Sequence, residues 1–344
     1  MFNPKFVITN KLLENIKRIN LMVNDLNHHR FPDPVLVELR KIAEATSTHA
    51  STSIEGNPLP LTDVKQILKH KPEYIRSSER EVLNYNTILK KINEKIEKGS
   101  INITLDLILS IHREITDKLL PDFKSGHLRT EPVFVNNPIL RKTIYWPPDH
   151  ADVAKLINDL IDFINNKRQK IDPLIVAGIF HKQLVIIHPF TDGNGRTTRL
   201  LTKILMAAMG LNIFNLFSFE NYYNQNVSLY FAMVGVKGNY YEVYKNIDFT
   251  EWLEYFTDGI IDELLRVEKI LPKININPQT RLLSYHNKML KFIQDKGFIT
   301  DDDYSKLVPR AKATRRLDFN KLISLKLIER KGKGKQTHYK LKEK

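Results

Sequence analysis

The spacing of apolar residues along this chain predicts a mainly helical protein. Between residues 11 and 48, leucines and isoleucines recur at intervals of three and four, and two prolines interrupt the repeat. The polar stretch 60–97 and the amphipathic stretch 104–120 follow the same period. We therefore expect several helices before residue 121.

The most apolar stretch runs from Leu174 to Ile187 and follows Asp172-Pro173, a pair that suits the start of a helix. A helix that is apolar on nearly all sides lies inside a protein, so we expect it to form the centre of the core. His181 lies within it and His188 follows it. No third ligand and no HExxH sequence accompanies these histidines, so we expect no zinc site.

Two short runs between residues 121 and 148 differ from the helical pattern. Residues 132–135 and 143–146 are rich in β-forming side chains, and Asn-Asn-Pro separates them at 136–138. This arrangement predicts a β-hairpin. The amphipathic stretch before it contains His112, which we interpret as a packed core residue.

The stretch 188–199 reads His-Pro-Phe-Thr-Asp-Gly-Asn-Gly-Arg-Thr-Thr-Arg, and its residue types suit phosphate chemistry. Gly193 and Gly195 allow a ligand to approach the main chain, and a helical pattern begins directly after them. A glycine loop that opens a helix directs several N–H groups at one point and binds anions. Arg196 and Arg199 add guanidinium donors for phosphate oxygens.

Two further side chains in this stretch suit catalysis. His188 has an ordinary pKa at which it can accept a proton from a hydroxyl near neutral pH. Asp192 is a hard oxygen ligand of the kind that Mg²⁺ accepts beside substrate phosphates. A single histidine or Asp-Gly pair would be an ordinary loop or turn, but the full string predicts a nucleotide site.

Composition narrows the class of protein. The 344 residues are 42% hydrophobic and 27% charged, which is typical of globular proteins, and the absence of cysteine excludes disulfides and cysteine chemistry. We see no signal peptide in residues 1–10 and no apolar run of about 20 residues. We therefore expect a cytoplasmic protein without membrane association.

The net charge of +14 is concentrated at one end of the chain. Residues 281–344 hold 18 Lys and Arg against 7 Asp and Glu, and therefore carry +11. Basic segments of this kind favour DNA or another polyanion, although a solvated basic face is equally consistent with the charge.

The same C-terminal stretch has a recognisable order of elements. After a linker at 271–278, three helices precede a strand, a basic turn and a second strand, which resembles a winged helix-turn-helix fold. Arg315, Arg316, Lys321 and the Lys331–Lys335 wing are candidates for phosphate contacts. Alternatively, this domain packs on the region that contains residues 188–199 or on a partner protein.

The string from His188 to Arg199 resembles the Fic family signature HPFx(D/N)GNGRxxR at every position. The resemblance implies transfer of AMP from Mg-ATP to a Ser, Thr or Tyr hydroxyl of a target protein, with self-AMPylation in addition. It implies His188 as general base, Asp192 as the Mg²⁺ ligand and Arg199 on the γ-phosphate. The remaining members, implied to form the anion cradle, are Gly193, Asn194, Gly195 and Arg196.

An upstream segment resembles the inhibitory helix of this family, whose pattern is (S/T)xxxE(G/N). Ser51, Glu55 and Gly56 match it. A carboxylate at the end of a helix is poorly placed for the helix dipole, so another partner for Glu55 is expected. The resemblance implies that Glu55 pairs with Arg199 and occupies the γ-phosphate position, so that ATP binds unproductively.

Two other sites are implied by the resemblance alone. A hairpin flap, preceded by Gly126 and Arg129 and followed by Pro147-Pro148, pairs with a strand of the target in Fic proteins. An Asn and two Tyr line the adenine pocket there, whereas this chain has Phe231 in place of the second Tyr. The implied flap residues are Val133, Phe134, Val135, Ile144 and Tyr145, and the implied adenine contacts are Asn226, Tyr230 and Phe231.

We therefore predict four regions. Residues 1–100 form a helical region with an inhibitory helix at about 46–57, residues 101–260 the Fic core, 261–280 a linker, and 281–344 the winged helix. The predicted partners are the target protein, DNA and a second copy of the chain. Two alternatives stay open: a Fic enzyme that removes AMP or moves another phosphate group, and a DNA-binding regulator with a vestigial Fic core.

Overall fold

A computed structural model describes residues 2–28, 33–70, 72–99, 101–137, 142–167, 170–270, 282–325 and 327–342. The chain divides into two compact units. The first comprises residues 1–28 and 42–269, and the second comprises residues 29–41 and 270–344. Within the described residues, no helix is long and apolar enough to span a membrane.

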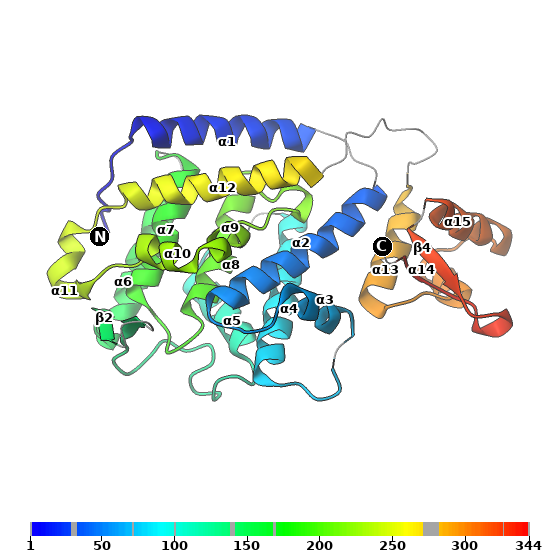
Figure 1. Cartoon of the computed structure of the whole chain (residues 1–344), viewed down its shortest axis with the longest axis horizontal. Helices are drawn as coiled ribbons and strands as arrows, with labels where there is room; N and C mark the ends of the chain where they lie inside the picture. Colours follow the sequence, from blue (N-terminus) through cyan, green and yellow to red (C-terminus); the bar gives the residue numbers. More distant parts are fainter. Residues whose placement is uncertain are drawn as a thin grey trace. The chain divides into compact units, whose positions relative to one another are not determined.

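The first unit is mainly helical, as the apolar spacing predicts (Figure 1). Only the part of α2 from residue 42 onward belongs to it. Its helices are α1 (Asn10–His28), α2 (Asp33–Ile54), α3 (Leu61–Lys69), α4 (Ser77–Lys98), α5 (Leu105–Thr116), α6 (His150–Lys167), α7 (Pro173–Ile187), α8 (Asn194–Ala207), α9 (Glu220–Gln225), α10 (Val227–Val234), α11 (Tyr240–Val243) and α12 (Thr250–Ile270).

Helix α7 forms the centre of this unit, as its sequence predicts. All but two of its fifteen residues are buried, and the Asp172 side chain accepts a hydrogen bond from the Leu174 N–H at its start. It packs against α6 and α8. The two elements that carry the signature, the end of α7 and the start of α8, are therefore fixed in the core.

Helix α1 runs alongside α12 (Figure 1). The Nζ of Lys11 lies 2.8 Å from the Oδ2 of Asp258, and the amide of Asn15 donates hydrogen bonds to Thr257 and Asp258. These polar contacts border an apolar face of α1 that includes the fully buried Leu12. The N-terminal helix is therefore part of the first unit.

The predicted hairpin is present, but its first strand covers 135–137 and not 132–135, so the two asparagines expected between the strands belong to the first strand. Strands β1 (Val135–Asn137) and β2 (Lys142–Trp146) pair antiparallel, and residues 138–141 between them lie outside the described part of the chain. A two-residue strand, β3 (Gly238–Asn239), pairs parallel with β2 and was not predicted. The order β1-β2-β3 leaves β1 at one edge of this sheet.

One boundary and one helix in the first unit also differ from the prediction. Helix α12 continues to Ile270, so the first ten residues of the predicted linker are helical, and the predicted linker at 271–278 lies outside the described residues. Helix α6 was not predicted, although Val153, Ile157 and Leu160 recur at helical spacing and are buried. Its apolar face packs on α7.

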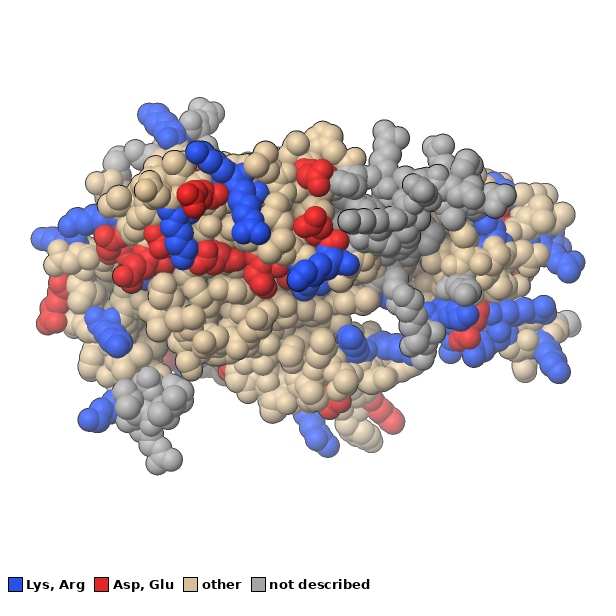
Figure 2. Space-filling model, turned by 45° about the horizontal axis from the view of Figure 1, so that its top comes forward, with Lys and Arg blue, Asp and Glu red and all other residues tan. Residues whose placement is uncertain are grey.

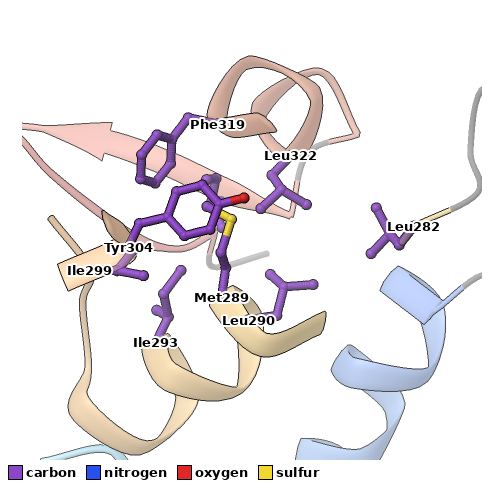
Figure 3. Packing of buried hydrophobic residues seen from close by; sticks show 9 residues of the cluster. Leu282, Met289, Leu290, Ile293, Ile299, Tyr304, Phe319 and Leu322 are labelled. Carbon is purple, nitrogen blue, oxygen red and sulfur yellow. The ribbon is translucent and has the colours of Figure 1, made fainter. Parts of the chain in front are cut away.

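The second unit has its own core. Three helices, α13 (Ser284–Lys296), α14 (Asp301–Leu307) and α15 (Lys312–Ser324), precede the antiparallel strands β4 (Ile328–Lys331) and β5 (His338–Leu341). Apolar side chains from these elements converge in a buried cluster (Figure 3). The order of elements is the predicted one, and the winged-helix assignment stays a prediction.

Basic side chains gather on the surface of the second unit (Figure 2). Two of the candidate phosphate contacts are paired with acids: Arg315 forms a bidentate ion pair with Asp301, and Lys331 lies 3.1 Å from Glu329. These pairs reduce the charge that either cation offers to DNA. Arg316, by contrast, is exposed.

Candidate active site

His188 terminates α7 in a left-handed conformation with φ of 51°. Its Nδ1 lies 3.3 Å from the carbonyl oxygen of Val185. Because a carbonyl only accepts, this contact places the proton on Nδ1 and leaves Nε2 unprotonated. Burial lowers the pKa of His188 below its ordinary value, although the carbonyl of Val185 and the carboxylate of Glu55 act in the opposite direction. The imidazole is therefore a neutral proton acceptor at pH 7.

Arg129 fixes the backbone at His188. Its Nε donates a hydrogen bond of 2.8 Å to the carbonyl oxygen of His188, and its Nη2 donates to the carbonyl oxygen of Pro148. The side chain is almost fully buried. The Gly-x-x-Arg sequence before the hairpin thus joins the hairpin base to the end of α7.

The loop after His188 is closed by the side chain of Asn194. Its Oδ1 accepts from the Phe190 N–H and its Nδ2 donates to the Phe190 carbonyl, both at 2.9 Å. Asn194 was expected in the anion cradle, but its amide is committed to the loop, and only its backbone remains for a ligand. Gly193, with φ of 79°, caps α8 in a conformation that glycine adopts readily.

His112 supports the same loop from α5. The Gly126 N–H donates to Nδ1 at 2.9 Å, so Nε2 carries the proton and donates to the Asp192 carbonyl at 3.0 Å. The ring also stacks on Phe190, with centroids 3.7 Å apart. His112 is fully buried, as expected, and its role in holding the loop was not predicted.

Arg196 lies between two carboxylates. Its Nη1 is 2.7 Å from Oε1 of Glu81, and its Nη2 is 3.0 Å from Oδ2 of Asp192. Burial raises the pKa of Glu81, and the guanidinium acts against that rise. Sequence reasoning missed Glu81, because α4 carries no motif that would distinguish it from other surface acids.

Arg199 is bound by the end of α2. Its Nη2 lies 2.8 Å from Oε1 of Glu55, its Nε donates to the Ser51 hydroxyl at 2.8 Å, and its Nη2 also donates to the Ser51 carbonyl. The guanidinium is completely buried. Gly56 then ends the segment with φ of 94°, a conformation that favours glycine. The expected pairing of Glu55 with Arg199 is present.

This ion pair lies directly against the first turn of α8. A Cβ on Gly195 would lie 2.1 Å from Oε1 of Glu55 and 2.8 Å from Nη1 of Arg199. That Nη1 is buried and has no hydrogen-bond partner among the residues that the structure describes. An unpaired guanidinium donor is costly to bury, so the arrangement favours an acceptor supplied by a ligand.

Six of the signature residues predicted to bind or act on ATP line one cavity of about 120 Å³, namely His188, Asp192, Gly193, Asn194, Gly195 and Arg199. Arg196, which was expected in the anion cradle, is absent from the lining. Tyr230 and Phe231 form its apolar wall, and the buried hydroxyl of Tyr230 is hydrogen-bonded to Nε2 of His181 at 2.9 Å. Asn226 is absent from the lining; its side chain caps α10 by accepting from the Leu229 N–H. The lining comprises Glu55, Val185, His188, Thr191, Asp192, Gly193, Asn194, Gly195, Arg199, Tyr230, Phe231 and Val234.

One expected flap residue has a different role. Tyr145 is buried, and its hydroxyl donates to the carbonyl oxygen of Ile186 at 2.9 Å. It therefore anchors the hairpin to α7, because β2 passes over the core at this residue, and it offers no surface to a target. Phe134 is 55% exposed, and Val133, Val135 and Ile144 are half-buried.

The donors at the cavity fit a magnesium ion held together with substrate phosphates. Asp192 lines the cavity with a side chain that is 54% exposed. No cluster of three or more His, Asp or Glu ligands occurs among the described residues. Mg²⁺ commonly takes one or two carboxylates, phosphate oxygens and waters, so a single accessible carboxylate is compatible with it.

Comparison with known proteins identifies relatives of this site. Residues 102–206 match the model of the Fic/DOC family. The protein adenylyltransferase Fic of Nematostella vectensis is 35% identical over 177 residues, which are 50% of this chain and 40% of the relative. The protein adenylyltransferase fic-1 of Caenorhabditis elegans is 30% identical over 211 residues, 59% of this chain and 39% of the relative. The chain thus spans less than half the length of these relatives.

Solved structures agree in fold. A Fic family protein from Desulfovibrio desulfuricans superposes with a TM-score of 0.63 at 19% sequence identity. The superposition covers 100% of this chain and 99% of the chain of that protein. Fic-1 from C. elegans gives a TM-score of 0.58 at 23% identity, over 75% of this chain and 72% of its own. Residues 102–206 thus match the Fic/DOC family model, and the solved Fic structures share the fold of this chain.

Proposed function

We propose that this protein is an autoinhibited protein adenylyltransferase, which transfers AMP from Mg-ATP to a Ser, Thr or Tyr hydroxyl of a target protein. The observation that supports it most is the convergence of His188, the α8 N-terminus and Arg199 on one cavity. A proton acceptor, a helix N-terminus and a buried guanidinium at one point are the groups that phosphoryl-type transfer requires.

In the proposed reaction, the target hydroxyl loses its proton to Nε2 of His188 and its oxygen attacks the α-phosphorus of ATP. The bond between that phosphorus and the bridging oxygen to the β-phosphate breaks, and pyrophosphate leaves. The backbone N–H groups at the start of α8 and the guanidinium of Arg199 bind phosphate oxygens. Asp192 would hold Mg²⁺, which neutralises phosphate charge when bound.

Catalysis would rest on positioning and on charge stabilisation, as in phosphoryl transfer generally. Loss of one such stabilising contact typically costs about 2.7–4 kcal/mol, or roughly a hundredfold or more in rate. Arg199 is the guanidinium nearest to the inhibitory segment, and we infer that its Nη1 and Nη2 are the donors for the γ-phosphate.

Autoinhibition is the second part of the proposal. Glu55 accepts a hydrogen bond from Nη2 of Arg199, and its Oε1 lies against Gly195 in the first turn of α8. A γ-phosphate placed there would meet a carboxylate of the same charge. ATP then binds with its phosphates displaced from the in-line geometry, and transfer is suppressed until Glu55 moves.

The position of the isotope in ATP tests the reaction type. We expect the Glu55→Gly variant to incorporate label from ATP labelled at the α-phosphate and to incorporate none from ATP labelled at the γ-phosphate. Incorporation from γ-labelled ATP would instead indicate phosphate transfer. A protein that already carries labelled AMP can be incubated with the enzyme in the presence and absence of ATP. Loss of the label at the same rate in both incubations would indicate that removal of AMP is the dominant activity.

A further inference from the structure

A second cavity lies beside the hairpin in the first unit. Its volume of about 240 Å³ is twice that of the cavity at His188. Three exposed aromatic side chains line it: Phe134 from the segment before β1, Trp146 from β2, and Tyr241 from α11. Exposed aromatic side chains gathered around one hollow are typical of binding sites.

Two of the three aromatic residues of this pocket are anchored to the fold. Trp146 pairs with Asn239 across the β2–β3 ladder. The hydroxyl of Tyr241 accepts a hydrogen bond from the Asp149 N–H at 2.9 Å and donates to Oδ2 of Asp152 at 2.6 Å. A pocket whose side chains are fixed before binding loses little entropy when a ligand enters.

One guanidinium joins the pocket to the catalytic histidine. Arg129 donates to the carbonyl oxygen of Pro148, which lines the pocket, and to the carbonyl oxygen of His188. An extended chain advances about 3.3 Å per residue. A segment with its hydroxyl at His188 therefore brings a side chain only a few residues away to the pocket.

The chemistry of the lining selects a cation. Among the described residues, the lining includes one carboxylate, that of Asp149, and no Lys, Arg or His. The carboxylate of Asp152 lies directly behind the hydroxyl of Tyr241 and makes this wall more negative. Guanidinium and ammonium groups bind over aromatic faces, and they do so more strongly beside a carboxylate.

We propose that the aromatic pocket binds an Arg or Lys side chain of the target, located a few residues from the hydroxyl that receives AMP. This inference rests on the proposed adenylyl transfer, because it assumes that a target segment lies at His188. It names a property of the target that the signature does not specify: a basic residue flanking the modified position.

Trp146 provides a readout that does not depend on catalysis. The chain has two tryptophans, and Trp252 is buried whereas Trp146 is 40% exposed in the pocket. We would titrate the full chain with a short Gly-Ser peptide that contains one arginine and, in parallel, with the same peptide containing neutral citrulline. We expect the arginine peptide to change the Trp146 emission at a concentration at least about fivefold lower.

Two variants control this measurement. Trp146→Phe keeps an aromatic face but removes the reporter, so the signal must vanish. Asp149→Asn preserves a residue type that caps helices well, at the start of α6, while removing the charge. The ratio of the affinities for the arginine and citrulline peptides must therefore fall toward one. Equal affinity for both peptides, an unchanged preference in Asp149→Asn, or no response to arginine would overturn the proposal.

A catalytic arm separates this proposal from the proposed function. This arm uses the Glu55→Gly variant, α-labelled ATP and a set of peptides in which the number of residues between a hydroxyl and an arginine is varied. Matched peptides carry leucine in place of the arginine. At one spacing, the arginine peptide should be labelled at least about fivefold better than its leucine counterpart. Labelling that favours leucine contradicts the pocket assignment alone. If arginine binds as expected but no label is transferred to any peptide or to the chain itself, adenylyl transfer is wrong.

Discussion

At the scale of single residues, the site depends on neutral histidines that are held by backbone carbonyls. His188 keeps Nε2 free because Nδ1 faces the Val185 carbonyl, and His112 holds the loop because Nδ1 accepts from Gly126. Burial lowers the pKa of both. Each therefore makes a prediction about pH, one for activity and one for stability.

The pKa of His188 predicts the acid limb of the activity profile. The base acts only when neutral, and its pKa lies below the ordinary value of 6.5. The carboxylate of Glu55 raises the pKa of His188, so its removal in the Glu55→Gly variant leaves this pKa below the ordinary value. We expect the rate of label transfer to fall in acid with a midpoint below pH 6.5. A limb with its midpoint above 6.5 would contradict the assignment of His188 as base.

The pKa of His112 predicts a loss of stability in acid. Burial lowers this pKa to about 4 in the folded chain, whereas the unfolded chain keeps about 6.5. The unfolded state then binds more protons between these values, so stability falls as pH drops through this window. From pH 7 to 5 we expect this residue to contribute a loss of about 2 kcal/mol.

Chemical unfolding of the wild type and of His112→Gln at pH 7 and pH 5, followed by tryptophan fluorescence, measures this contribution. The wild type should lose more stability than the variant over that interval. His112→Gln should also reduce transfer by Glu55→Gly at pH 7, since the Asp192 carbonyl loses its aligned donor. An identical pH dependence in both proteins would show that His112 is not the titrating group.

At the scale of elements, the central feature is the end of α2 against the start of α8. Three donor contacts from Arg199 reach Ser51 and Glu55, and all of them lie in buried or half-buried surroundings. The Glu81–Arg196–Asp192 chain then joins α4 to the same turn. The site is therefore assembled from helices that lie far apart in sequence.

The role of α4 can be tested through Glu81. In the Glu55→Gly background, Glu81→Gln should lower the rate of label transfer several-fold, because Arg196 then pairs with Asp192 alone and the carboxylate becomes less available to a metal. The loss should be smaller than the roughly hundredfold expected for a direct charge-stabilising contact. An unchanged rate would mean that the Glu81 contact has no influence on the site.

The elements also show why some features were predictable. The signature is continuous in sequence, so its residues could be assigned to one site, and the inhibitory pattern placed Glu55 at Arg199. Glu81 and the loop-holding role of His112 depend on long-range packing that leaves no local pattern. Strand β3 has only two residues, which is too short to show a periodic pattern. Tyr145 lies in a β-type run where the sequence gives no sign of burial, but its position over Ile186 buries it.

At the scale of the whole chain, the charge is concentrated in residues 281–344, which carry +11. Non-specific binding to DNA arises from such charge and weakens as salt increases. We expect the full chain to bind duplex DNA at low salt, with the exposed Arg316 contributing and the paired Arg315 contributing less. Fluorescence anisotropy during a salt titration measures this.

The substitution Arg316→Gln should make the slope of log K against log salt less steep by about 0.9, the value for one phosphate contact. Arg315→Gln should have a smaller effect. Binding that resists both salt and competitor DNA would indicate specific recognition, whereas no salt-dependent binding would indicate that the basic surface serves another purpose.

Incorporation of α-labelled AMP into the chain itself tests the central claim most directly, with the wild type, Glu55→Gly, Glu55→Gly/His188→Ala and Ser53→Gly compared at pH 7.5. Ser53→Gly places a glycine in the same last turn of α2 without touching Arg199. We predict strong labelling of Glu55→Gly only, with the wild type and Ser53→Gly close to background and the double variant without label. Equal labelling of Glu55→Gly with and without His188, or no labelling of Glu55→Gly, would contradict the account.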